Sequence, residues 1–192
     1  MSEFLAGLRA RVGHDLLVLP SVTACVFDDD GRLLLACHAE AQDLWAPPGG
    51  IVEPDEDPAD AVVREIHEEL GLEIRVHGII GAYGGPEFRV EYPNGDKVSY
   101  VTTLFACTAN GDTIRPDGVE ISAARWCSAA DAAALRTPRW VPLALPDCFD
   151  WWRQTRPWHR SVTGFSSEEG LAAVPDELAK RGVLRQRPDQ RQ

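Results

Sequence analysis

The stretch GIVEPDEDPADAVVREIHEELGL, from Gly50 to Leu72, contains most of the chemical information in this chain of 192 residues. Its fixed positions follow one spacing: a glycine, five residues, a glutamate, seven residues, then Arg-Glu-Ile-x-Glu-Glu-x-Gly-Leu. Asp57 is a suitable N-cap and Pro58 suits the first helical position, while Gly71 is suited to end a helix. The stretch therefore predicts a helix that begins near Pro58 and ends before Gly71.

The acidic side chains of that helix share one face. Glu65, Glu68 and Glu69 stand at positions i, i+3 and i+4, which places their carboxylates on the same side. The opposite side carries an apolar, core-facing stripe, made of Val62, Ile66 and Leu70. Like charges at this spacing repel by roughly 0.2–0.5 kcal/mol per pair, so a divalent cation is the simplest compensation. Mg²⁺ prefers carboxylates together with substrate phosphates, and Mn²⁺ accepts the same ligands.

Charge and composition narrow the class of protein. Residues 49–72 contain eight acidic residues and one basic residue, a net −7 within a chain total of −11. An anionic substrate approaches such a segment only together with metal ions, and the same charge argues against nucleic acids or anionic membranes as partners.

The five cysteines form no CxxC pair, which is typical of buried, reduced thiols. With no signal-like segment and no apolar run near 20 residues, we expect a cytoplasmic protein.

Apolar periodicity and turn signals predict strands on both sides of the central helix. The expected strands are 22–27, 32–38, 73–83, 88–92, 98–108 and 124–127, and the expected further helices are 2–12, 128–135 and 147–154. The turn signals are strongest at 28–31 and at Asn94-Gly95. This order predicts an α/β fold, with a mixed β-sheet between helices in an α/β/α sandwich.

Two segments outside the helix also carry predictions. The approach Pro47-Pro48-Gly49-Gly50 is stiff at its prolines and permissive at its glycines, so Gly49 and Gly50 are expected to bring the backbone close to metal or phosphate. Toward the C-terminus the chain supplies four of its six tryptophans, at positions 140, 151, 152 and 158. The last segment, 179–192, has a net charge of +4 and is expected to fray.

The spacing from Gly50 to Leu72 resembles the signature of the Nudix hydrolases. The resemblance extends over about residues 15–136, and segments 8–15 and 92–96 look like a bacterial mutator-type, ADP-ribose-pyrophosphatase-like subgroup. It implies the Nudix sandwich fold, magnesium dependence, and attack of water on phosphorus in a diphosphate linkage. The implied substrate is a small nucleoside diphosphate derivative, either a sugar nucleotide such as ADP-ribose or a (deoxy)nucleoside triphosphate. The implied organisation is a helical extension at 1–14, the Nudix domain at 15–136, and a tryptophan-rich extension with a basic tail at 137–192, packed on that domain in its first part.

The resemblance also assigns roles to residues. The positions that correspond to the metal site are Glu56, Glu65, Glu68 and Glu69, with the backbone of Gly49 beside them. Arg64 resembles the arginine that orients a nearby carboxylate. The general base is Glu65 or Glu69 within the motif, or Glu120 on a later loop. Candidate substrate contacts are Phe88, Arg89 and Tyr92.

Rival interpretations stay open from the sequence. One is hydrolysis of a non-nucleotide diphosphate, such as a prenyl diphosphate, with the tryptophans of 140–158 around an apolar cavity. Another is a Nudix-like module that senses a nucleotide without cleaving it, although such modules have eroded motifs and this motif is complete. A homodimer, formed through the helix at 2–12 or the tryptophan-rich region, is a further hypothesis.

Overall fold

The chain divides into two compact units, Met1–Trp152 and Arg153–Gln192, and the fold described below is that of the first. A computed structural model describes residues 3–39, 43–111 and 113–162. The basic segment 179–192 lies outside the described residues, so its fraying stays a prediction. Within the described part of the chain, no helix is long and apolar enough to cross a membrane.

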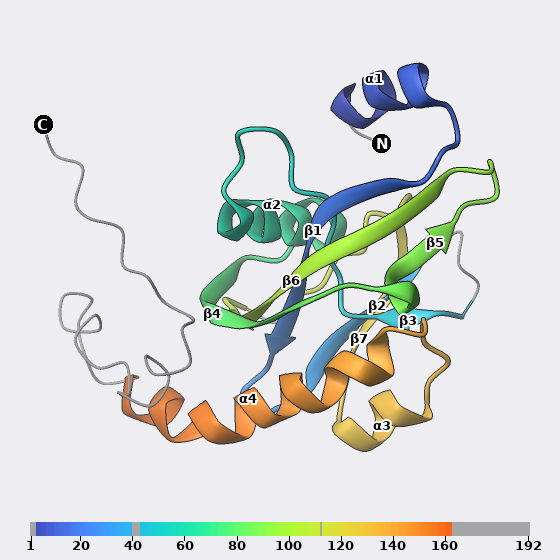
Figure 1. The fold of residues 1–192 in the computed structure, drawn as a ribbon. Coiled ribbons are helices and arrows are strands. Elements are labelled where there is room, and N and C mark those ends of the chain that lie inside the picture. Colours follow the sequence, from blue (N-terminus) through green and yellow to red (C-terminus); the bar gives the residue numbers. More distant parts are fainter. Residues whose placement is uncertain (1–2, 40–42, 112, 163–192) are drawn as a thin grey trace, which may run out of the picture. The chain divides into compact units, whose positions relative to one another are not determined.

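A mixed sheet, seven-stranded over the described residues, forms the centre of the first unit (Figure 1). Its strands are β1 (Leu17–Phe27), β2 (Leu33–His38), β3 (Trp45–Ala46), β4 (Ile74–Tyr83), β5 (Arg89–Glu91), β6 (Lys97–Ala109) and β7 (Ile121–Cys127). The main order is β3-β2-β1-β6-β4, with β5 paired to β6 and β7 paired to β2. β1 and β6 run parallel, with Leu17 opposite Val98 and Phe27 opposite Thr108. The other strand pairs are antiparallel.

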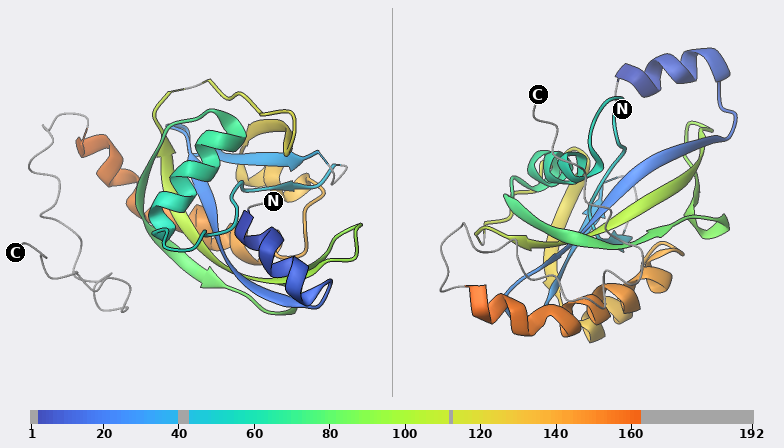
Figure 2. Two further views of the ribbon diagram at one scale, coloured as in Figure 1. Left: turned by 90° about the horizontal axis from the view of Figure 1, so that it is seen from above. Right: turned by 60° about the vertical axis from the view of Figure 1, so that its left-hand side comes forward.

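Helices cover both faces of this sheet. They are α1 (Glu3–Val12), α2 (Pro58–Leu70), α3 (Ala129–Ala134) and α4 (Val141–Val162), with a short 3₁₀ turn η1 at Pro86–Phe88. Figures 1 and 2 show α2 on one side of the sheet, and α3 and the start of α4 on the other. The predicted α/β/α sandwich with a mixed sheet is confirmed.

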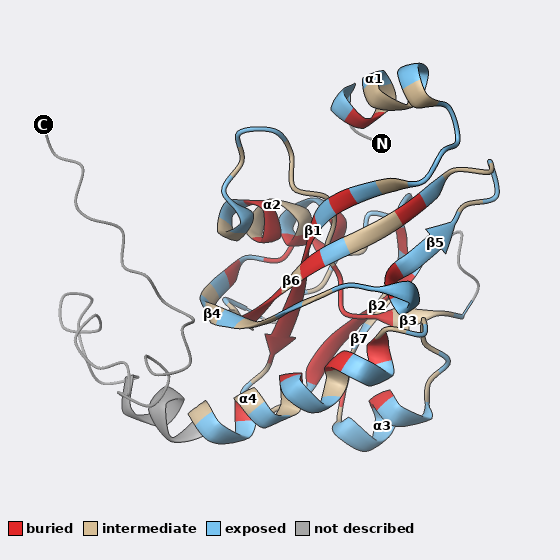
Figure 3. Cartoon of the chain, viewed as in Figure 1, coloured by how far each residue is buried: buried red, intermediate tan, exposed pale blue. Residues whose placement is uncertain are grey.

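The inner side of α2 is the apolar stripe expected from the sequence. Val62, Ile66 and Leu70 are each 0% exposed and pack on β1 and β6 through residues such as Val22 and Phe105. Figure 3 shows the same side of α2 and the middle strands as buried. Because burying such a side chain contributes about 1.5–3 kcal/mol, this stripe fixes the rotation of α2 and hence the side to which its glutamates point.

The opposite face of the sheet is filled by tryptophans and cysteines. Trp152 stacks on Phe27 with 5.1 Å between ring centroids, and Trp140 stacks on Phe88 at 5.7 Å. Cys148 Sγ of α4 lies 3.1 Å from Cys25 Sγ of β1. All five cysteines are buried thiols, as predicted. Trp140 and Trp152 therefore pack within the core, and they are not available as walls of an apolar substrate cavity.

The N-terminal helix α1 is held against the start of β1 and the β5–β6 hairpin. Leu5 of α1 joins Leu19 and Val98 in a small buried cluster. The Arg9 guanidinium donates hydrogen bonds to the carbonyls of Gly13, Asp15 and Lys97 at 3.1, 2.7 and 2.9 Å. Leu5 of α1 is thus covered by its own chain, whereas Phe4 is 51% exposed.

The structure differs from the sequence prediction most at α4. The predicted helix was 147–154, whereas α4 begins at Val141. Pro146 lies inside this helix, although proline lacks the backbone N–H that a helix interior uses. The helix nevertheless runs through it, since Val141, Ala144 and Cys148 are each buried to 1% exposure or less on one side of the helix. Tertiary packing has outweighed the local helix-breaking signal.

Candidate active site

The catalytic helix is capped at both ends as the sequence predicted. Asp57 Oδ1 accepts a hydrogen bond from the Ala59 N–H at 2.9 Å, and Gly71 has the left-handed φ of 59°. Gly71 N–H also donates to the His67 carbonyl at 2.9 Å. These caps set the length of α2, so the three motif glutamates of its last two turns occupy fixed positions.

Arg64 holds the acidic side chains in place. Its Nε lies 2.7 Å from Glu56 Oε1, and a second guanidinium nitrogen donates to Glu56 Oε2 at 2.9 Å. Its Nη1 lies 2.9 Å from Glu65 Oε1 and 3.1 Å from Glu68 Oε2. The hydrogen bonds between Arg64 and Glu56 lower the pKa of Glu56 and raise the pKa of Arg64. Arg64 therefore orients three carboxylates at once.

Glu65 and Glu69 are carboxylates in an unfavourable environment. The Glu65 side chain is 14% exposed, and Glu69 is only 4% exposed. Burial raises the pKa of Glu65, although Arg64 opposes the effect. Burial, reinforced by the charges of Glu65, Glu120 and Asp117, raises the pKa of Glu69 to about 8. Without a bound cation, negative charge on Glu69 is costly.

Glu69 is also incompletely hydrogen-bonded. Its carboxylate accepts a hydrogen bond from the backbone N–H of Gly49. Its Oε2 atom is buried and has no hydrogen-bond partner within the described residues. An unpartnered buried oxygen costs about 1–3 kcal/mol, and more when charged. A cation bound at this oxygen would remove that cost.

The two glycines before α2 are required by close contacts. A Cβ at Gly50 would lie 2.3 Å from the Cδ atom of Glu65, so a larger residue would force that carboxylate to move. A Cβ at Gly49 would lie 2.2 Å from the Val22 carbonyl oxygen, and Gly49 has a φ of 152°. The backbone was expected to approach metal or phosphate here. This stays a prediction; the close protein neighbours are a motif carboxylate for Gly50 and strand β1 for Gly49.

Glu120 lies far from the motif in the sequence, but the fold brings it near Glu65 and Glu69. It is exposed at the start of β7, and its charge raises the pKa of both Glu65 and Glu69. The loop before it contains Asp117, which sequence reasoning missed. The turn dipeptide Asp117-Gly118 was the available signal, because aspartate side chains hydrogen-bond backbone amides two or three residues ahead.

These groups bring several carboxylates near one another. Glu65, Glu69 and Glu120 lie within reach of one another's charge, and Glu68 joins them through Arg64. In the parts of the chain that the structure describes, no group of three or more aspartate, glutamate, histidine or cysteine side chains is arranged to hold a metal ion. Mg²⁺ keeps several waters and binds through few carboxylates plus substrate phosphates, so an open arrangement is compatible with it.

Comparison with known proteins gives the family. A profile described as NUDIX domain matches residues 18–147. This chain belongs to the Nudix family. With its complete motif it is a Nudix pyrophosphohydrolase, an enzyme that acts on phosphorus-containing anhydrides.

Individual relatives agree with this placement. A MutT-like protein from Streptomyces ambofaciens is 30% identical over 130 residues, which cover 68% of this chain and 76% of that protein. A putative 8-oxo-dGTP diphosphatase from Bacillus subtilis is 32% identical over 103 residues, 54% of this chain and 62% of the relative. The crystal structure of a MutT NUDIX hydrolase from Burkholderia pseudomallei superimposes with a TM-score of 0.55 at 26% identity, covering 68% of this chain and 98% of that one.

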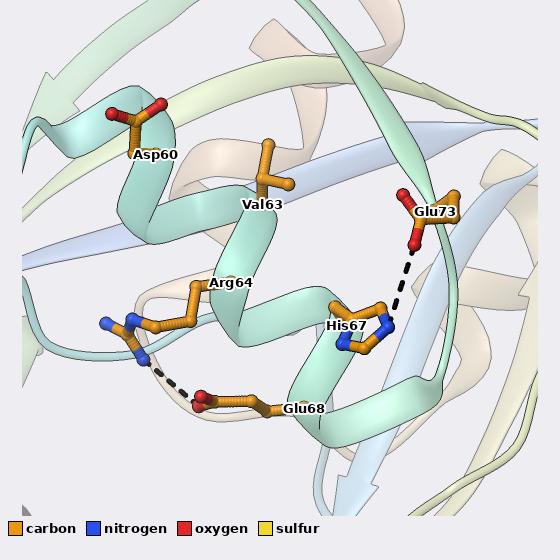
Figure 4. Close-up of a pocket in the computed structure, with 6 residues that line it drawn as sticks. All are labelled: Asp60, Val63, Arg64, His67, Glu68 and Glu73. Atoms are coloured by element: carbon orange, nitrogen blue, oxygen red, sulfur yellow. Dashed lines mark hydrogen bonds and ion pairs between the residues drawn. The ribbon is translucent and has the colours of Figure 1, made fainter.

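A shallow hollow lies on the solvent side of the Nudix helix. It has a volume of about 350 Å³ and is lined by Asp60, Val63, Arg64, His67, Glu68 and Glu73. Figure 4 shows Arg64 and Glu68 pointing toward each other along one edge, while His67 points toward Glu73. Glu65 and Glu69 are absent from its lining, so this hollow is the wet face of α2 and not the carboxylate site.

The three predicted substrate residues lie in different environments. Phe88 is 4% exposed and is stacked on Trp140, so its ring has a packing role. The Tyr92 hydroxyl lies 2.6 Å from the Tyr100 hydroxyl in a half-buried pair. Arg89 is exposed on β5. Substrate contact by Arg89 and Tyr92 stays a prediction.

Proposed function

We propose that this Nudix enzyme hydrolyses a diphosphate linkage in a nucleoside diphosphate derivative, with Mg²⁺ as its cofactor and Mn²⁺ as a substitute. The observation that carries the proposal is the buried, unpartnered Oε2 of Glu69 beside Glu65 and Glu120. Such an arrangement is unfavourable by itself and becomes favourable when a cation binds. The relative named as a putative 8-oxo-dGTP diphosphatase favours a (deoxy)nucleoside triphosphate over a sugar nucleotide such as ADP-ribose.

Each residue has a distinct part in this proposal. Glu65, Glu68 and Glu69 would hold the ion, and Glu56 keeps Arg64 in position to orient them. The bound ion supplies positive charge that neutralises the diphosphate and makes a water more acidic. The Gly49 N–H fixes one oxygen of Glu69, which leaves the other directed at the site.

We assign the proton acceptor to Glu120, ahead of Glu65 and Glu69. Glu65 is engaged with Arg64 and Glu69 is buried, whereas Glu120 is exposed and lies beside both. An exposed carboxylate can exchange a proton with solvent after each turnover.

A phosphate-release screen over nucleoside triphosphates, sugar nucleotides and prenyl diphosphates, with and without Mg²⁺, tests the proposal. We expect metal-dependent release from a nucleotide and a loss of at least about a hundredfold in kcat for Glu65→Gln. Glu73→Gln is the matched control, because Glu73 is 67% exposed and pairs only loosely with His67, at 3.6 Å.

Three outcomes would contradict the proposal in different ways. Release only from prenyl diphosphates would identify a non-nucleotide hydrolase. Tight nucleotide binding without release would identify a sensor. A Glu65→Gln variant as active as Glu73→Gln would show that the carboxylate site is not the reaction centre.

We also propose a homodimer as the assembly to be tested. Its interface would use α1, where Leu5 packs on the same chain but Phe4 is 51% exposed, or the tryptophan-rich region. Light scattering at micromolar concentration that gives the chain mass of 21.1 kDa would reject it.

A further inference from the structure

The loop from Arg115 to Ile121 is fastened to the C-terminal end of the Nudix helix. The Arg115 N–H donates to the Leu70 carbonyl at 2.7 Å, and the Asp117 N–H donates to the Glu69 carbonyl at 3.0 Å. The last carbonyls of a helix have no partner within the helix, so a passing loop that supplies donors is held firmly there. One of the two residues fastened this way is Glu69, the buried carboxylate of the site.

The Asp117 side chain closes the rest of the loop into a rigid turn. Its Oδ1 accepts hydrogen bonds from the backbone N–H groups of Val119, Glu120 and Ile121 at 3.1, 3.1 and 2.8 Å. Its Oδ2 accepts a second bond from the Glu120 N–H at 3.1 Å. These hydrogen bonds, the one from Ile121 first among them, lower the pKa of Asp117. Both oxygens are therefore committed to the loop and are not free to act as metal ligands.

We propose that Asp117 is a positioning residue, which sets the Glu120 backbone so that its carboxylate faces Glu65 and Glu69. The inference rests on the proposed function and deepens it, because it assigns the placement of the fourth carboxylate to one side chain. The Glu120 amide is the only one of the three that both Asp117 oxygens accept from. Without this side chain, three consecutive amides lose this acceptor. The backbone bonds from Gly118 N–H to the Ile121 carbonyl at 3.1 Å and from Ala39 N–H to the Glu120 carbonyl at 2.9 Å would remain.

Three substitutions of Asp117 separate the effect of its hydrogen bonds from the effect of its negative charge. Asp117→Asn keeps the Oδ1 acceptor, on which three of the four bonds converge, and removes the negative charge. Asp117→Ala removes both, and Asp117→Ser keeps a single weaker acceptor. A matched control is Asp28→Ala, because Asp28 Oδ1 accepts from the N–H groups of Asp30 and Arg32 at 3.0 and 2.8 Å in a turn distant from the site in sequence.

The experiment measures kcat, KM and Mn²⁺ affinity by calorimetry, in a double-mutant cycle with Glu120→Gln. We expect Asp117→Ala to lower kcat by about ten- to a hundredfold with little change in KM, and Asp117→Asn to stay within about threefold of the native enzyme. Asp117→Ser should lie between them. The double variant Asp117→Ala/Glu120→Gln should be no slower than Glu120→Gln alone, since a misplaced base and an absent base are equivalent.

Several results would overturn the inference. The first is an Asp117→Ala variant that loses no more activity than Asp28→Ala. The second is a double variant whose losses multiply. If Asp117→Ala does not fold, the same comparisons are made with Asp117→Ser. If the native chain cleaves none of the diphosphates, the proposed function fails, and the inference is then decided by Mn²⁺ affinity, which should be weaker in Asp117→Ala than in Asp117→Asn.

Discussion

Replacing Glu69 with glutamine should make the metal-free protein more stable at alkaline pH. The substitution keeps the size of the side chain and the acceptor for the Gly49 N–H, and it removes the negative charge. Below pH 4 the carboxyl is protonated in both the folded and the unfolded chain, so no stabilisation is expected there.

The size of the effect follows from the raised pKa. As pH rises from 4.5 toward about 8, the unfolded chain releases the Glu69 proton while the folded chain retains it, so the stability of the native protein falls. Above that range the loss is complete, with an upper limit of about 5 kcal/mol. The glutamine leaves a buried amide N–H group unpartnered, which costs about 1–2 kcal/mol. We therefore expect a net gain of at most about 3–4 kcal/mol, or roughly 6–16 °C in Tm.

Thermal unfolding at pH 5, 7 and 9, in chelator and in millimolar Mn²⁺, measures this effect. Glu68→Gln is the control, because Glu68 is the adjacent motif glutamate and its side chain is 60% exposed. The native protein should gain more stability from Mn²⁺ at pH 9 than Glu69→Gln does. The reasoning is refuted if Glu69→Gln melts no higher than the native protein in chelator at pH 9, or if it keeps the full stabilisation by Mn²⁺.

Three further substitutions test other parts of the structure. Gly50→Ala should lower Mn²⁺ affinity and kcat by about tenfold or more, measured by calorimetry and initial rates, because its Cβ would lie 2.3 Å from the Glu65 carboxylate carbon. Arg64→Lys should lower kcat by roughly ten- to a hundredfold at unchanged Tm, since an ammonium group cannot pair with several carboxylates at once; near-native kcat would contradict this. Trp152→Ala should cost about 3–5 kcal/mol in denaturant unfolding, because the ring is 6% exposed, whereas Val18→Ala, at 67% exposure, should cost little.

The helix and its ligand face could be predicted because their causes are local. The N-cap Asp57, the C-cap Gly71 and the spacing of the glutamates all lie within one stretch of chain. Strand positions could be predicted from apolar periodicity, which is also a property of each local stretch of sequence. What the spacing could not show is that Glu69 is buried while Glu68 is exposed, because that difference depends on the backbone of Gly49 lying against one side of the helix.

The parts that could not be predicted depend on contacts between distant residues. Asp117 lies 48 positions after Glu69, and only the fold brings its loop to the end of α2. Phe88 resembled a residue for stacking on a base, but the fold places Trp140 against its ring. The start of α4 at Val141 could not be predicted either, because it depends on the packing of α4 on the sheet.

The five buried cysteines can serve as probes of when individual helices and strands of the protein open. Each buried thiol belongs to a different element, with Cys25 on β1, Cys37 on β2, Cys107 on β6, Cys127 on β7 and Cys148 on α4. A thiol reagent reaches such a group only when its element opens, so the labelling rate of a single-cysteine variant reports the opening of that element alone. Comparing the rates for Cys25 and Cys148, whose sulfur atoms lie 3.1 Å apart, would reveal whether α4 separates from the sheet before the sheet itself comes apart.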